Sequence, residues 1–280
     1  MPDEEFNKYW FDQIKEVVDQ YSLDMIWFDS WFNLIPEKNR QEMTAYYYNE
    51  ANKKRQEVTI GYKQTDLPLE VGILDIEQGG KKELSERVWM TDVTLSKQSW
   101  CYVDGQTYKD ATLVLRNMID VWSKNGIVLL NLSPTKAGEI PQAQREVLHE
   151  IGTWLSQNGE AIYNTKAHTY YGFGTAQTQN GRHGGQSATT EYSADDVRFT
   201  CSKDGKTLYA IFLGAPTVGE RVNIRQLAPH RYPVRGIFKR AILLGTDIEA
   251  KVEMGQNQCY ITIPEGKMNE MATVFKFEFE

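Results

Sequence analysis

Met25-Ile26-Trp27-Phe28-Asp29 is a short apolar run that ends abruptly in a carboxylate. Gly72-Ile73-Leu74-Asp75-Ile76-Glu77 is a second apolar run that ends in the same way. Between them, the residue pattern predicts a polar-faced helix over Arg40–Glu57 and a strand over Val58–Tyr62. Strands that alternate with helices are typical of a parallel α/β sheet or barrel. These stretches therefore predict an α/β fold in which carboxylates follow the strands.

The same alternation extends on both sides of these stretches. The spacing of apolar residues predicts helices at 5–21, 108–123 and 141–157, and strands at 89–95 and 126–132. Pro141 suits the first residue of its helix, and Asn158-Gly159 suits the C-cap. The run 126–132 is apolar enough for a strand that is buried on both faces, as parallel strands are.

The second half of the chain has a different residue pattern. Residues 166–192 are rich in Gly, Thr, Gln and Tyr, which indicates an irregular linker or strand-loop segment. Short β runs with turns such as Asp204-Gly205 follow, and they favour a β-sandwich. The predicted strands are 197–200, 208–212, 241–244, 260–263 and 274–277. We therefore expect a parallel α/β sheet or barrel over 1–165 and a β-sandwich domain over 166–280.

Composition excludes several classes of function. The net charge of −7 argues against nucleic-acid binding, which needs a basic face. No apolar stretch approaches the roughly 18 residues that span a membrane, so no membrane partner is expected. The N-terminus shows no signal-peptide pattern. The cysteines and histidines lack metal-site spacing, so no metal is expected: Cys101, Cys201, Cys259, His149, His168, His183 and His230.

Asp29 and Glu77 are the candidate catalytic residues. Barrel enzymes place such residues at the C-terminal ends of strands, where both acids stand. Glycoside hydrolysis needs two carboxylates, one ionised and one protonated. The alternative is that each acid merely caps the helix that follows. Nearby Trp27, Trp31 and Trp89 favour the catalytic interpretation, because aromatic rings form platforms for sugars as well as core.

Several segments in succession resemble one family. Asp24-Met25-Ile26-Trp27-Phe28-Asp29-Ser30 resembles the nucleophile segment of the α-L-fucosidases of glycoside hydrolase family 29. The remaining matches follow in the family's order: Trp89-Met90-Thr91-Asp92, Ser99-Trp100-Cys101-Tyr102, Asn125 to Pro134, Gly152-Thr153-Trp154-Leu155, Asn158 to Tyr163, Asp196 to Thr200 and Leu208-Tyr209-Ala210. The resemblance covers nearly the whole chain and implies a retaining exo-α-L-fucosidase. It also implies that residues 1–165 form a partial (β/α)8-like catalytic domain.

The resemblance assigns the nucleophile to Asp29. Many members carry the acid/base as the Glu of a Trp-Glu-Thr motif, and Met90 stands there in this chain. Other members carry it in a motif that resembles Asp75-Ile76-Glu77-Gln78-Gly79. Glu77 is therefore the expected acid/base, with Glu83 and Glu86 as alternatives. A retaining pair stands about 5–5.5 Å apart.

The family also implies the ligand and the compartment. The substrate would be a fucosylated oligosaccharide or glycoconjugate. The candidate residues to face its sugar are Trp27, Trp31, Trp89 and Trp100. No cofactor is expected, because displacement at an acetal carbon needs only acid, base and nucleophile. Family members are mostly secreted, periplasmic or lysosomal. The linkage preference is left open.

The resemblance has one discrepancy. The family's barrel normally begins well over a hundred residues before its nucleophile strand, whereas here the nucleophile is residue 29. The resemblance therefore implies that the first three barrel strands are absent, that the chain is truncated, and that it is unstable or inactive alone. The missing N-terminal half of the barrel would be a partner. A fucose-binding remnant without catalysis and an inactive fragment are the alternatives to a working fucosidase.

Overall fold

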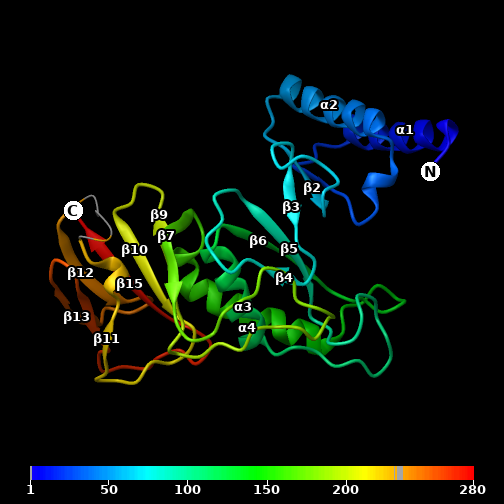
Figure 1. Ribbon diagram of the computed structural model, residues 1–280. Helices are drawn as coiled ribbons and strands as arrows, with labels where there is room; N and C mark the ends of the chain where they lie inside the picture. The colour runs from blue at the N-terminus through cyan, green and yellow to red at the C-terminus, as the bar shows by residue number, and fades with distance from the viewer. Residues whose placement is uncertain (1, 230, 232–235) are drawn as a thin grey trace. The chain divides into compact units, whose positions relative to one another are not determined.

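The computed structural model describes residues 2–229, 231 and 236–280, so His230 lies outside the described residues. The chain divides into two compact units (Figure 1). The first unit holds the residues up to Glu77 together with Val88–Met90, and the second holds Gln78–Arg87 together with Thr91–Glu280. In the described part of the chain, no helix is both long enough and apolar enough to cross a membrane.

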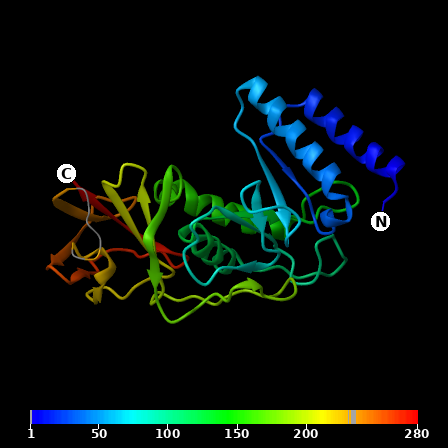
Figure 2. The same ribbon diagram turned by 45° about the horizontal axis from the view of Figure 1, so that its top comes forward.

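The first unit contains two helices and a parallel sheet. Helices α1 (Glu4–Gln20) and α2 (Glu37–Lys54) lie side by side (Figures 1 and 2). Strands β1 (Met25–Trp27), β2 (Thr59–Lys63) and β3 (Ile73–Asp75) run parallel in that order. A short 3-10 helix spans Phe32–Leu34. The predicted helices and strands of this region are confirmed, with ends shifted by up to three residues.

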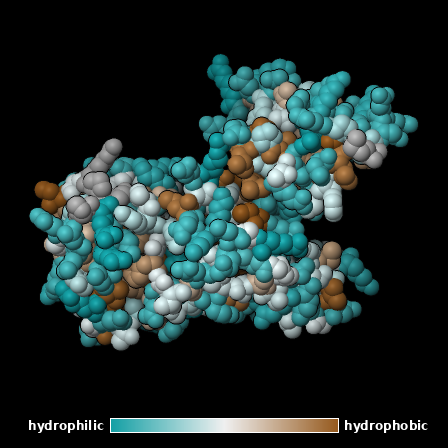
Figure 3. All heavy atoms as spheres, in the orientation of Figure 1, coloured by the Kyte–Doolittle hydropathy of each residue, from teal (hydrophilic) through white to brown (hydrophobic). Residues whose placement is uncertain are grey.

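Apolar side chains of these helices and strands form one core. Val18, Met43, Tyr47, Ile60 and Tyr62 are each at most 3% exposed. Asp3 caps α1, because its carboxylate accepts a 2.8 Å hydrogen bond from the Phe6 N–H, as an N-cap residue does. On the face drawn in Figure 3, hydrophobic residues gather on this unit below α2. The core fixes the sheet whose strand ends carry the candidate site.

Strand β5 (Trp89–Thr94) begins in the first unit, where Leu74 pairs with Trp89, and continues into the second. It is followed by α3 (Ala111–Ser123), β6 (Gly126–Asn131) and α4 (Gln142–Asn158). In the described residues the strand order is β1-β2-β3-β5-β6. This order of parallel strands and helices is the predicted partial barrel.

Two details of this region differ from the prediction. Strand β6 is not buried on both faces, since Ile127 is 43% and Leu129 42% exposed. Burial on both faces needs a layer on each side, and β6 ends the strand order with α3 packed on one face. The C-cap of α4 is Gly159, but with φ −60 it is right-handed and continues into a 3-10 turn over Gly159–Ala161.

The C-terminal sheet has the expected sandwich character. Among the described residues its eight strands follow the order β11-β14-β13-β12-β15-β10-β9-β7. They are β7 (Thr165–Phe173), β9 (Val197–Ser202), β10 (Thr207–Phe212), β11 (Arg221–Asn223), β12 (Phe238–Leu243), β13 (Glu249–Met254), β14 (Cys259–Thr262) and β15 (Thr273–Phe279). Phe199, Phe275 and Ile261, from distant positions in this order, share one core. The sheet therefore folds over on itself.

Some strands were not predicted. Strand β7 and the short β8 (Gly181–Arg182), which pairs with β4 (Gly79–Gly80), lie in the region expected to be irregular. Strands β11 and β13 are additional, and their polar residues give no apolar run. Cys201 and Cys259 are buried, whereas Cys101 is exposed. The predicted domain boundary at 165/166 coincides with the start of β7 and stays a prediction.

Helices α3 and α4 pack against the C-terminal sheet within the second unit. The Trp154 Nε1–H donates a 2.8 Å hydrogen bond to the Ala272 carbonyl. The Arg116 guanidinium donates to the carbonyls of Tyr192, Glu270 and Met271. Leu115, Ile151 and residues of β10 and β15 share a second core. Barrel-type helices and the β-rich region thus form a single compact unit.

Candidate active site

Three charged side chains of the first unit stand at the C-terminal ends of its parallel strands. Asp29 lies two residues beyond β1, Lys63 is the last residue of β2, and Glu77 lies two residues beyond β3. Because these strands run parallel, their C-terminal ends share one edge of the sheet. That edge is where barrel enzymes carry their chemistry.

Lys63 joins the two predicted catalytic carboxylates. Its Nζ lies 2.9 Å from Asp29 Oδ1 and 3.3 Å from Glu77 Oε2. The Lys63 side chain is only 6% exposed, whereas those of Glu77 and Asp29 are 20% and 67% exposed. The two carboxylate oxygens are therefore no farther apart than the sum of 2.9 and 3.3 Å. The structure thus brings Asp29 and Glu77 to the same lysine.

The environment of Asp29 favours its ionised form. Partial burial acts to raise the pKa of its carboxyl group, but hydrogen bonds from Lys63 and from the Ser30 N–H (2.8 Å), together with the Lys63 charge, hold the pKa below its ordinary value. A charge partner and hydrogen bonds to the charged form both act in this direction. Asp29 is thus a carboxylate at neutral pH, as a nucleophile requires.

Trp27 forms one wall of this cluster. Its Nε1–H donates a 2.8 Å hydrogen bond to Asp75 Oδ2, and the Lys63 Nζ lies 5.3 Å from the centre of its ring. The ring packs over Gly61: a Cβ on that residue would lie 2.7 Å from Trp27 Cδ1. The absence of a side chain at Gly61 therefore lets Trp27 pack beside Lys63.

The other tryptophans lie in different environments. Trp31 is 68% exposed and has a φ of 76°, a left-handed conformation that is uncommon for a bulky residue. Trp89 is 1% exposed and belongs to the interior of the first unit. Trp100 is half-buried in the second unit, and its carbonyl accepts a 2.9 Å hydrogen bond from Asn131 Nδ2. Contact of these rings with a sugar stays a prediction.

The alternative acid/base positions are placed as follows. Met90 is 2% exposed, and its carbonyl accepts a 2.8 Å hydrogen bond from the Ile76 N–H. Its thioether has no proton to transfer. Glu83 and Glu86 are exposed residues of the second unit, where Glu83 interacts electrostatically with Lys124. Within the first unit, Glu77 is the one of the predicted acids that contacts Lys63 together with Asp29.

Sequence reasoning missed Lys63. The signal was present, because Lys63 directly follows the predicted strand Val58–Tyr62 just as Asp29 and Glu77 follow theirs. The prediction considered only carboxylates, so it did not include the cation at the same edge of the sheet. Among the described residues, no three His, Cys, Asp or Glu side chains are grouped as a metal site would require, and the cation between the carboxylates is a lysine.

Comparison with known proteins identifies the family. A sequence model described as Alpha-L-fucosidase matches residues 1–160, more than half of the chain. The chain belongs to the alpha-L-fucosidase family. It is 28% identical over 223 residues to the plasma alpha-L-fucosidase of Rattus norvegicus, with 74% of this chain and 43% of that protein covered. The tissue alpha-L-fucosidase of Homo sapiens is 30% identical over 161 residues, with 55% of this chain and 34% of that protein covered.

Solved fucosidase structures share the fold. The Thermotoga maritima alpha-fucosidase in complex with a mechanism-based inhibitor has a TM-score of 0.74 at 23% identity, covering 99% of this chain and 57% of that one. A family 29 α-L-fucosidase of Bacteroides thetaiotaomicron, trapped as a covalent intermediate, has a TM-score of 0.70 at 17% identity, covering 99% and 61%. This chain thus spans less than two thirds of the length of these fucosidases.

Proposed function

We propose that this chain carries the nucleophile and the acid/base of a retaining exo-α-L-fucosidase. The observation that supports the proposal is the Asp29–Lys63–Glu77 cluster at the C-terminal edge of the parallel sheet. Asp29 attacks the anomeric carbon as the glycosidic bond breaks, and a covalent fucosyl-enzyme forms. Glu77 gives its proton to the departing oxygen. It then takes a proton from the water that releases fucose and regenerates Asp29.

The separation of the carboxylates supports retention. Inverting enzymes need about 6.5–9.5 Å between their two carboxyl groups to admit a water, whereas retaining enzymes have about 5–5.5 Å. The Lys63 contacts of 2.9 and 3.3 Å keep the contacting oxygens of Asp29 and Glu77 below the inverting range. The Bacteroides thetaiotaomicron relative, whose covalent intermediate was trapped with a fucosyl fluoride, makes the same mechanism reasonable here.

Lys63 has a supporting role in this proposal. Its ammonium group contacts both carboxylates, so it keeps Asp29 ionised before attack and orients Glu77 beside it. When Asp29 becomes an uncharged ester in the fucosyl-enzyme, Lys63 still contacts Glu77, at 3.3 Å, and keeps it oriented for the second half of the double displacement.

The substrate and setting follow from the family. The substrate class is a terminal α-L-fucoside on an oligosaccharide or glycoconjugate. The exposed ring of Trp31, two residues after Asp29, is the best placed of the predicted aromatic residues to meet the sugar or the group it leaves. A secreted, periplasmic or lysosomal compartment fits relatives that include plasma enzymes.

One observation favours a second function, fucose binding without hydrolysis. Met90 stands where the resemblance places the acid/base of many family members, and it is buried and aprotic. If Glu77 does not act in its place, the Asp29 site would bind a fucoside and leave the glycosidic bond intact. The two functions differ in whether the bond to the leaving group is broken.

The testing experiment is release of p-nitrophenol from its α-L-fucoside by the purified chain. We expect turnover that Asp29→Asn abolishes. Asp29→Gly supplied with azide should then form β-fucosyl azide, because azide enters the vacated space on the nucleophile's side. Binding of L-fucose without turnover in the wild-type chain, measured by calorimetry, would support the second function and contradict the first.

A matched set of variants tests the acid/base. Glu77→Gln should retain turnover of p-nitrophenyl fucoside better than turnover of a fucosylated disaccharide, because nitrophenolate leaves without a proton. Glu83→Gln and Glu86→Gln should leave both rates near wild type. Loss of disaccharide hydrolysis in Glu83→Gln or Glu86→Gln instead of Glu77→Gln would move the acid/base to that residue.

A further inference from the structure

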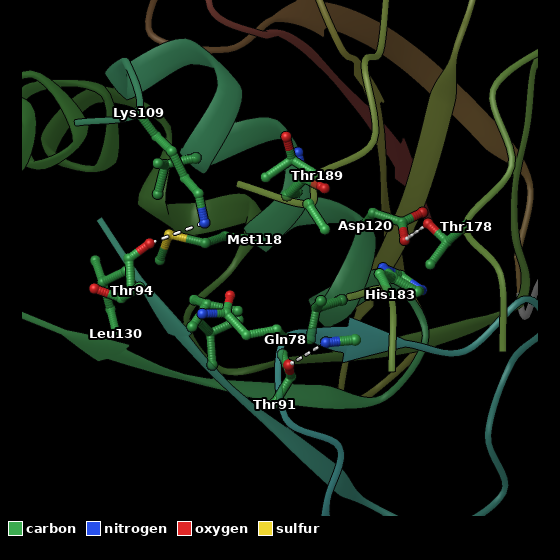
Figure 4. A pocket seen from close by; sticks show the side chains of 17 residues that line it. Gln78, Thr91, Thr94, Lys109, Met118, Asp120, Leu130, Thr178, His183 and Thr189 are labelled. Carbon is green, nitrogen blue, oxygen red and sulfur yellow. Dashed lines mark hydrogen bonds between the residues drawn. The ribbon is translucent and has the colours of Figure 1, made fainter. Parts of the chain in front are cut away.

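The second unit contains a small cavity of about 50 Å³ behind strands β5 and β6 (Figure 4). Residues of helix α3 and of the segment 178–189 also line it. Val93, Val114, Met118, Val128 and Leu130 give it an apolar wall. No residue of the Asp29 cluster lines it. It is therefore independent of the proposed fucosidase chemistry.

Gln78 points its amide group into this cavity (Figure 4). The residue is 3% exposed, and neither Nε2 nor Oε1 of its side chain has a hydrogen-bond partner within the described part of the chain. Its backbone is held on both sides, because its N–H donates to the Asp92 carbonyl at 2.9 Å and its carbonyl accepts from the His183 N–H at 3.1 Å. Buried polar groups normally have partners, so the amide is presented to something that fills the cavity.

Lys109 enters the cavity from the opposite side (Figure 4). It is 4% exposed, and its Nζ donates a 2.9 Å hydrogen bond to the Thr94 carbonyl. No carboxylate pairs with it among the described residues. Burial, with the nearby Lys97 charge, lowers the pKa of Lys109 to about 8. The Lys109 ammonium group therefore has further N–H donors available, and no carboxylate of the described residues pairs with its charge.

The other charged group on the cavity wall is already neutralised. Asp120 Oδ1 lies 2.6 Å from Arg198 Nε, and its Oδ2 lies 2.8 Å from Lys124 Nζ. The Thr178 hydroxyl also donates to Oδ2 at 2.9 Å. The Asp120 carboxylate is therefore already paired with Arg198 and Lys124. The positive charge of Lys109 consequently has no partner on the cavity wall.

We propose that this cavity binds a small monovalent anion, held by the Lys109 ammonium group and the Gln78 side-chain N–H. A buried charge is stable when it is paired, and the cavity offers donors from two directions beside an apolar wall. A water needs about 10–15 Å³ of such a volume, so the space admits a halide ion with a water that donates to Gln78 Oε1. A six-carbon anion such as gluconate is too large to enter.

Thermal unfolding in chloride tests the site. Sodium chloride replaces sodium gluconate at constant ionic strength, and we expect the Tm of the wild type to rise and then saturate, because a ligand of the folded state stabilises it. Lys109→Met should abolish the response, and Gln78→Met, which keeps the side-chain length at φ 46°, should shift saturation to higher chloride. Lys97→Met, which removes an exposed lysine near Lys109, is the control and should keep a saturating rise of Tm in chloride.

Crystals grown in bromide supply a second readout that does not depend on the variants. An anomalous bromide peak beside Lys109 Nζ in the wild type supports the site. Water density alone in the cavity, a wild-type Tm that does not respond to chloride, or an unchanged response in Lys109→Met would each overturn it. If Lys109→Met fails to fold, Gln78→Met and the bromide peak still decide the question.

Discussion

Lys63 Nζ lies 2.9 Å from Asp29 Oδ1, and it is the buried partner of an exposed carboxylate. The ammonium group is held in place by its surroundings, so the pair does not pay the ordering cost of two flexible surface side chains. The same nitrogen contacts Glu77. Lys63 therefore contacts both of the acids on which the proposed mechanism rests.

Replacing Lys63 by Met should impair catalysis through Asp29. The hydrogen bond and charge that hold the Asp29 pKa low would be lost, so the acid limb of the pH profile of kcat/KM should move to higher pH. We expect kcat/KM at neutral pH to fall by roughly 10²-fold, the size typical of one electrostatic contact in an active site. Lys63→Arg keeps the charge and should move the limb less. An acid limb unchanged in Lys63→Met would contradict the role of Lys63.

Adding a methyl group to Gly61 should disturb the site and the fold. The new Cβ would lie 2.4 Å from Met25 Cε and 2.7 Å from Trp27 Cδ1, so the Trp27 ring beside Lys63 must move. We expect Gly61→Ala to lose about 1–3 kcal/mol of stability, as overpacking does, and to lower kcat/KM. Denaturant unfolding and p-nitrophenyl fucoside hydrolysis measure the two effects.

Gly152 supplies the matched control for this prediction. It lies on the exposed face of α4, and a Cβ there would meet nothing within 4 Å. Gly152→Ala should therefore gain about 0.5–1 kcal/mol, since glycine is a poor helix former. Equal effects of Gly61→Ala and Gly152→Ala would show that close packing at Gly61 is not what constrains it.

The parallel strands and their helices were predictable because each combines a strong local pattern with a buried face. Met25–Trp27 and Ile73–Asp75 are apolar runs of strand length, and α3 repeats apolar residues at helical spacing. Strand β13 was missed because its Lys251 and Glu253 side chains are on an exposed face. The exposure of Ile127 could not be predicted, since it depends on which layers cover β6 and not on β6 itself.

The carboxylates of the site were predictable and their cation was not. Asp29 and Glu77 follow apolar runs, and parallel strands bring such positions to one edge. Lys63 has the same signal, but a lysine after a strand is usually solvated. Only its burial and its two contacts distinguish it. The unpartnered Gln78 amide was likewise invisible in the sequence, because its environment comes from segments about a hundred residues apart in the chain.

Neutralising Asp120 should destabilise the second unit strongly. Arg198 and Lys124, both buried, lie 2.6 and 2.8 Å from its carboxylate. Asp120→Asn would remove the carboxylate that pairs with both buried cations, and breaking a buried pair in this way costs about 3–5 kcal/mol. Because Arg198 is on β9 and Asp120 on α3, the ion pair joins a barrel-type helix to the C-terminal sheet. Denaturant unfolding measures the change.

The exposed pair Arg221–Glu253, at 2.6 Å, provides the comparison for Asp120. Arg221→Gln breaks a contact of similar length in solvent, where an ion pair contributes little, so its unfolding midpoint should stay close to that of the wild type. If Asp120→Asn lowers the free energy of unfolding as little as Arg221→Gln does, the buried charges of Arg198 and Lys124 are compensated by other groups.

Stability should fall in acid because of His168 on β7. This histidine is fully buried, and burial lowers its pKa from 6.5 to about 4, although the Tyr170 carbonyl, 2.9 Å from Nδ1, acts to raise the pKa. In the neutral ring Nδ1 accepts a 3.1 Å hydrogen bond from the Tyr170 N–H. Between these two pH values the unfolded chain binds a proton that the folded chain does not. The stabilisation is therefore complete above pH 6.5, is lost as the pH falls from 6.5 to about 4, and amounts to up to about 3 kcal/mol.

His168→Asn isolates this contribution, because the amide oxygen can accept the same hydrogen bond without titrating. The free energy of unfolding of the wild type, minus that of His168→Asn, should be constant above pH 7 and should shrink by up to about 3 kcal/mol between pH 6.5 and 4. His149→Asn changes an exposed histidine on α4 and should give a curve parallel to that of the wild type. Parallel curves for His168→Asn and the wild type across this range would show that His168 is protonated as readily in the folded chain as in the unfolded one.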